Sequence, residues 1–177
     1  MSETDLLGGN IGLITHSFYK KIVPRRGNFK DKDFYVSKQL LSTLKTNNKM
    51  LQITGSIFAD ENGYDNCLVL NDEKNVVEAL QSNLFMKTGN VIITPPVSDG
   101  CLNGIMRKQV IEILKKMEGI EVKEVSISPF DLQKADELFL TNVISGVQPI
   151  TQYRKKGYQF DFANDVLKRL NAKIRLS

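Results

Sequence analysis

The stretch NVVEALQSNLFMKTGNVIIT, residues 75–94, decides the fold of this chain. It holds three short apolar runs, and a fourth run, CLVLN, precedes it. Turn residues separate the runs, including Asn71-Asp72 and Thr88-Gly89-Asn90. Short apolar runs bounded by turn residues are typical of strands joined in hairpins. We therefore predict an antiparallel meander with strands at residues 67–71, 75–79, 83–87 and 90–94.

Helical patterns lie on both sides of this meander. Before it, NNKMLQITGSIFADENG has a rough apolar face and ends at Asn62-Gly63, where a glycine commonly follows a helix. The residues of that face are Met50, Leu51, Ile53, Ile57 and Phe58. After the meander we expect helices at residues 105–117 and 161–174, strands at 120–127, 137–143 and 145–150, and a short helix capped by Ser128. Because strands and helices do not alternate regularly, the pattern predicts a mixed α/β (α+β) domain and disfavours a parallel Rossmann sheet.

The N-terminal part is harder to interpret. Residues 19–34, YKKIVPRRGNFKDKDF, are charged and broken by Pro24 and Gly27, which favours a loop or linker. Residues 36–44, VSKQLLSTL, fit either a strand or a short helix. We predict an N-terminal arm or linker over residues 1–39 and a single folded domain over residues 40–177.

Composition excludes several classes of function. The chain has 177 residues, 41% of them apolar and 25% charged, with a net charge of +4. Its basic residues occur in short groups mixed with acids, so we expect no nucleic-acid partner. With one histidine and two distant cysteines, Cys67 and Cys101, we expect no metal site and a reducing, cytoplasmic location. We find no membrane-length apolar run and no signal peptide.

Three side chains are candidates for chemistry. Lys45 follows an apolar lead-in; it is either an ordinary surface lysine or a nucleophile for Schiff-base chemistry in a partly apolar site. Glu78 ends an apolar strand, so it is either exposed at an edge or paired with a cation such as a protonated pyridine nitrogen. Asn83 is either a turn residue or a support for the loop that carries Glu78.

The loop TPPVSDGCLNG, residues 94–104, is a candidate anion site. Gly100 and Gly104 bracket a tight turn that leads directly into the helix expected at residue 105. Free N–H groups and the helix dipole attract anions at such a junction. Any loop-to-helix junction shares these features, so the loop alone does not decide the matter.

Together these pieces resemble the class IV, fold-type IV pyridoxal-phosphate enzymes, which include branched-chain and D-amino-acid aminotransferases and aminodeoxychorismate lyases. The resemblance covers roughly residues 40–172, nearly all of the family's large domain. It implies a mostly antiparallel pseudo-barrel of strands flanked by helices, pyridoxal 5'-phosphate as cofactor, and a homodimer. The matching segments are LKTNN (44–48), NVVEALQSNLF (75–85), TPPVSDGCLNGIMRKQV (94–110) and KADELFLTNVISGVQPI (134–150).

The resemblance also implies a role for individual residues. Lys45 matches the lysine that forms the Schiff base with the cofactor and then moves the substrate proton. Glu78 matches the acid that keeps the pyridine nitrogen protonated, so that the ring accepts electrons. The remaining cofactor-binding positions are Asn83, the phosphate loop Gly104, Ile105 and Met106, and the strand end Thr141, Asn142 and Val143. Many relatives have a hydroxyl residue at the position of Val143, which can donate only from its backbone.

Two departures from the family separate the functional hypotheses. Met50 stands where branched-chain aminotransferases usually have a tyrosine, which leaves more room for a lyase. The 44 residues before Lys45 do not match the family's small domain, although Arg25 or Arg26 is a possible replacement for its phosphate-binding arginine. We expect an aminotransferase acting on an amino acid and a 2-oxo acid. The alternatives are an aminodeoxychorismate lyase, which releases pyruvate to give 4-aminobenzoate, and a truncated, inactive large domain that acts as a partner.

Overall fold

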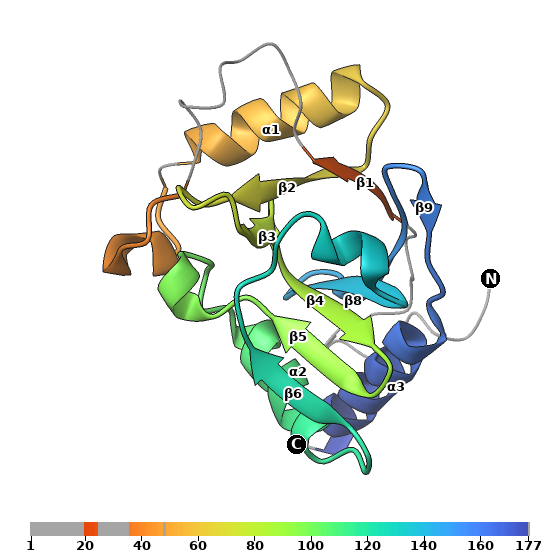
Figure 1. The fold of residues 1–177 in the computed structure, drawn as a ribbon. Helices are drawn as coiled ribbons and strands as arrows, with labels where there is room; N and C mark the ends of the chain where they lie inside the picture. The colour runs from red at the N-terminus through yellow and green to blue at the C-terminus, as the bar shows by residue number, and fades with distance from the viewer. Residues whose placement is uncertain (1–19, 25–35, 48, 177) are drawn as a thin grey trace, which may run out of the picture.

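The computed structural model describes residues 20–24, 36–47 and 49–176 (Figure 1). Its helices are α1 (Met50–Glu61), α2 (Ile105–Lys115) and α3 (Asp161–Leu176). Short 3₁₀ turns lie at Leu40–Thr43, Val97–Asp99 and Asp131–Lys134. The strands are β1 (Lys20–Pro24), β2 (Asn66–Leu70), β3 (Val76–Ala79), β4 (Ser82–Thr88), β5 (Val91–Thr94), β6 (Glu121–Glu124), β7 (Glu137–Asn142), β8 (Gly146–Tyr153) and β9 (Lys156–Gly157). The predicted meander is confirmed, because β2, β3, β4 and β5 pair antiparallel in chain order.

The strands of the described chain close into a ring. Their order is β3-β2-β1-β8-β7-β4, and β3 also pairs with β4, which completes the ring. β5 and β6 continue the sheet outward from β4. The pairs of β1 with β2 and β8 and of β5 with β6 are parallel, and the other pairs are antiparallel. This confirms the expected mixed fold, a mostly antiparallel pseudo-barrel flanked by helices.

The two faces of the ring hold separate hydrophobic clusters. Alternate residues such as Leu84 and Leu140 face the interior, which Leu132 of the 128–135 segment helps to fill. On the outer face, Phe85 and Phe139 stack with ring centroids 5.0 Å apart, in a cluster that includes residues of α2 and α3. A third cluster joins α1 to β2 and β3. Figure 1 shows α1 on one side of the barrel and α2 and α3 together on another.

The prediction of a loop or linker over residues 19–34 is wrong for Lys20–Pro24. These residues form β1, which lies between β2 and β8 and closes the ring. Both neighbours are distant in the sequence, so a five-residue strand with two lysines and a proline gives no local signal. The predicted arm therefore contributes a strand to the sheet. Residues 25–35, with Arg25 and Arg26, lie outside the described residues.

The helix α1 ends as predicted, with Asn62 at its C-cap and Gly63 at φ 68°. Its predicted apolar face is partly wrong, because Met50, Ile53 and Ile57 are 63%, 52% and 53% exposed. The helix packs instead through Gly55 and Ala59, together with Leu51 and Phe58. A side chain at Gly55 would collide with Leu80, so the small residue allows the helix to approach the sheet closely.

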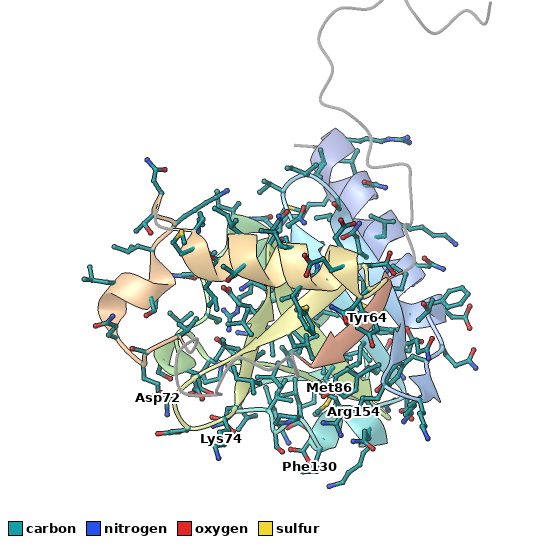
Figure 2. The ribbon with its side chains drawn as sticks, turned by 90° about the horizontal axis from the view of Figure 1, so that it is seen from above. Tyr64, Asp72, Lys74, Met86, Phe130 and Arg154 are labelled. Carbon is teal, nitrogen blue, oxygen red and sulfur yellow. The ribbon has the colours of Figure 1, made fainter. Side chains whose placement is uncertain are left out.

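Residues 153–160, YRKKGYQF, lead from the end of β8 through β9 to α3. Tyr153 and Tyr158 are buried, and the Lys156 ammonium donates to the carbonyls of Gln133 and Ala135. Arg154, at φ 55°, turns the chain between β8 and β9, as Lys74, at φ 65°, does between β2 and β3 (Figure 2). The short helix predicted from Ser128 begins later, at Asp131.

The packing of α1 can be tested by replacing an isoleucine with alanine on α1 and, for comparison, on α2. Ile53→Ala on α1 should change the free energy of unfolding by less than about 0.5 kcal/mol, because the side chain is already in solvent. Ile111→Ala on α2 removes a buried side chain and should cost about 2–5 kcal/mol. Urea denaturation of both variants measures the difference, and similar losses would mean that Ile53 is covered in solution.

Candidate functional site

A row of buried polar side chains crosses three neighbouring strands. Glu78 on β3 pairs with Asn83 on β4, and Asn83 pairs with Thr141 on β7. Residues paired in this way point to the same face of a sheet. The same face carries Phe85 and Phe139 two residues farther along, so the row lies on the outer face, beside α2. All three side chains are buried.

The loop 95–104 meets this row through the peptide groups of one residue. The Leu102 N–H donates to Oε2 of Glu78 at 2.9 Å, and the Leu102 carbonyl accepts from Nδ2 of Asn83 at 2.8 Å. Gly104 is the N-cap of α2, and a side chain at this position would collide with Oδ1 of Asn83. A side chain at this position would therefore displace Asn83 or move the start of α2 away from the polar row.

The start of α2 has the geometry of an anion site. No side chain caps it, and the first N–H groups of any helix, here those of Ile105 and Met106, lack partners within the helix. The helix dipole places positive partial charge at the same point. Ile105 is 68% exposed and Met106 is buried, so neither side chain provides a polar group and any anion would bind to the backbone.

The carboxyl group of Glu78 has a strongly altered acidity. Burial raises its pKa to about 7, while the N–H of Leu102 and the charge of Lys49 act in the opposite direction. No salt bridge to Glu78 occurs within the described part of the chain. A cation brought against this carboxylate would therefore favour its charged form.

The hydroxyl of Thr141, in the same row, lacks a hydrogen-bond partner. Its Oγ1 is buried and has no hydrogen-bond partner among the described residues. Buried hydroxyls without a partner are rare, because each costs free energy relative to its hydrated state. A polar ligand beside Asn83 would satisfy this group.

The segment that carries Lys45 is bonded to the loop 95–104 through its backbone. Two residues before it, the Thr43 carbonyl accepts from the N–H of Asn103 at 3.3 Å. The segment that carries Lys45 is thus bonded to the same loop that contacts Glu78 and Asn83. The Lys45 side chain is exposed. Asn48 of the predicted motif lies outside the described residues.

Asn142 and Val143 have different surroundings at the end of β7. Oδ1 of Asn142 accepts from the N–H groups of Ile144 and Ser145, and its Nδ2 donates to Oγ of Ser82. The Asn142 side chain therefore holds the β7–β8 turn and ties it to the β3–β4 turn. Val143 is exposed and offers only its backbone N–H.

Sequence reasoning missed three groups. The backbone of Leu102 bonds to both Glu78 and Asn83, but a backbone contact leaves no trace in residue type. The charge of Lys49 lowers the pKa of Glu78, but in the sequence only its position near Lys45 could have indicated this. Arg107 is buried within α2, and a charged residue among the apolar positions of that helix was its one signal.

The described part of the chain meets the requirements of neither a metal site nor a membrane-spanning helix. No group of three or more histidine, cysteine, aspartate or glutamate side chains is placed to hold a metal ion there. None of the described helices combines the length and apolar character needed to cross a membrane.

The amino-transferase class IV family model matches residues 14–153. The chain belongs to this family. The match extends through β1, the meander, the loop 95–104 and α2 to the end of β8, so it includes every group described above.

Individual relatives span more than one activity. A Methanocaldococcus jannaschii protein assigned as a branched-chain-amino-acid aminotransferase is 33% identical over 132 residues, 75% of this chain and 46% of its own length. The aminodeoxychorismate lyase of Vibrio harveyi is 29% identical over 123 residues, 70% of this chain and 45% of its own. The chain thus spans about half the length of these relatives.

A solved structure supports the fold. An aminotransferase from Brucella abortus, crystallised with pyridoxal phosphate, matches 93% of this chain and 57% of its own with a TM-score of 0.77 at 24% identity. At this identity the likeness concerns the fold alone.

The acidity of Glu78 predicts how stability depends on pH. Because its pKa is raised in the folded state, the folded chain binds more protons than the unfolded chain between about pH 4.5 and 7. The free energy of unfolding should therefore fall by about 3 kcal/mol as pH rises through this window, and then level off. Glu78→Gln should remove the fall, whereas Glu118→Gln, at an exposed acid, should not. Chemical denaturation at each pH measures it, and a flat wild-type profile would contradict the unpaired carboxylate.

Proposed function

We propose that this chain binds pyridoxal 5'-phosphate and transfers an amino group between an amino acid and a 2-oxo acid. The observation that carries the proposal is the buried carboxyl of Glu78, bonded to the loop that leads into the open N-terminus of α2. An acid that could face a ring nitrogen and N–H groups that could bind a phosphate would match two polar parts of this cofactor. Membership of the class IV family supports the same cofactor.

The residues present fit the cofactor in three respects. The Glu78 carboxyl has lost its ordinary acidity through burial, and a protonated ring nitrogen would restore its charge. The orphaned hydroxyl of Thr141 offers an unused hydrogen bond on the same face. Gly104 lets the start of α2, with its uncapped N–H groups, approach Asn83 closely.

When bound, pyridoxal phosphate supplies an aldehyde and an electron-accepting ring. Glu78 would hold the proton on the ring nitrogen, and Asn83 fixes the loop that orients Glu78. The backbone N–H groups of Ile105, Met106 and Val143 would bind the phosphate. Lys45 would supply the amine that attaches to the cofactor and then moves the Cα proton of the substrate.

Aminodeoxychorismate lyase is the second candidate. Two observations favour it: the similarity to the Vibrio harveyi lyase, and Met50 at the position of the tyrosine usual in branched-chain aminotransferases. The third candidate is a large domain without turnover that pairs with another chain. We also propose that the chain forms a homodimer, as the family resemblance implies.

The Lys45 assignment is tested by spectroscopy. The wild-type protein with added pyridoxal phosphate should develop a visible absorbance band, and borohydride treatment should leave a covalent mass increase on Lys45. Lys45→Ala should lose both, because the Schiff base is proposed to form on this amine, whereas Lys115→Ala at the end of α2 should retain both. Identical spectra for wild type and Lys45→Ala would refute the assignment.

The reaction is tested by offering both substrates. An aminotransferase should pass the amino group of a donor amino acid to 2-oxoglutarate and release no pyruvate from aminodeoxychorismate. The reason is that Lys45 would return the proton taken from Cα rather than promote elimination. Pyruvate and 4-aminobenzoate formation would instead identify a lyase. The absorbance band without either reaction would identify an inactive partner domain.

A further inference from the structure

Arg107 occupies an electrostatically unfavourable position. It is the third residue of α2, and its side chain is only 3% exposed. The positive end of the helix dipole disfavours a cation in the first turn. A buried cation also requires partners, since desolvation is costly. Its contacts must therefore compensate for both effects.

The Arg107 guanidinium bonds to the ends of two strands. Its Nη2 donates to the Pro95 carbonyl at 2.9 Å and to Oε2 of Glu124 at 2.6 Å. Pro95 directly follows β5, and Glu124 is the last residue of β6, where it pairs with Thr94. The guanidinium thus joins the first turn of α2 to the ends of both strands.

These contacts close the loop 95–104. The loop begins at Pro95, which accepts the bond, and it ends three residues before Arg107, which donates it. Between these points lie Leu102, which contacts Glu78 and Asn83, and Asn103, which contacts Thr43. These bonds from the loop to the Lys45 and Glu78 segments therefore lie within the part that Arg107 closes.

We propose that Arg107 is a positioning residue, whose bonds to Pro95 and Glu124 hold the loop 95–104 closed so that Leu102 and the first turn of α2 keep their places in the site. The consequence for cofactor binding rests on the proposed function. The closure of the loop is a property of the chain without cofactor, so the two can be tested separately.

Hydrogen exchange of the full chain without cofactor tests the closure. In Arg107→Lys and Glu124→Gln, the amides of Leu102 and Asn103 should exchange about tenfold faster than in the wild type, because a charge-assisted bond that closes the loop is weakened. Glu121→Gln is the matched control, because Glu121 lies on the same strand and pairs with Lys123 instead. It should leave both amides unchanged.

A second readout separates positioning from general destabilisation. Since the Leu102 N–H lowers the pKa of Glu78, loosening the loop should raise that pKa further, as followed by carbon NMR of the carboxyl group. Amides at the centre of β7, away from the loop, should keep their wild-type protection in Glu124→Gln. If Arg107→Lys fails to fold, Glu124→Gln decides, because the Glu124 side chain is 43% exposed and tolerates the change.

The outcomes distinguish the two proposals. Wild-type exchange at Leu102 and Asn103 in the variants, with the pKa of Glu78 unchanged, would overturn the positioning role even if the wild type binds pyridoxal phosphate. Faster exchange in the variants, together with a wild type that does not bind pyridoxal phosphate, would support the closure of the loop and refute the proposed function.

Discussion

The arrangement of the candidate site depends on the peptide groups of Leu102. Its N–H bonds to the buried carboxylate of Glu78, and its carbonyl bonds to the amide of Asn83. Glu78 would be costly to bury without this donor, and Asn83 would lose a partner if the loop moved away. Because Glu78 and Asn83 are paired across β3 and β4, the two bonds fix the loop to a rigid hairpin. The start of α2, three residues beyond Leu102, is therefore held against the same face of the barrel.

The closed ring of strands makes this arrangement possible. Glu78, Asn83 and Thr141 fall into one row only because β3, β4 and β7 are neighbours in register. The ring is completed on its far side by β1, which joins β2 to β8. A sheet without free edges along this path resists slippage, so the polar row and the helix keep a constant relation.

Much of the fold could be predicted because its signals are local. The meander is marked by apolar runs and by turn residues such as Gly89, and α2 by its buried positions, including Val110 and Leu114. β1 could not be predicted, because both of its partners are distant in the chain. The buried face of α1 was misjudged because Gly55 and Ala59, rather than the larger Ile53 and Ile57, allow close packing.

Some residues of the candidate site would act through their side chains and others only through their backbone. Glu78 and Asn83 act through their own functional groups, so a residue pattern can identify them. Ile105, Met106 and Val143 offer only backbone N–H groups, and any side chain that fits leaves those groups in place.

Such backbone positions can be found only from their place after a recognisable glycine or strand. Asn142 is intermediate, since its amide is used to shape the turn that presents Val143. The apolar residues around the candidate anion site are therefore compatible with the proposed phosphate binding, because the helix end and the loop backbone, rather than hydroxyl side chains, would provide the donors.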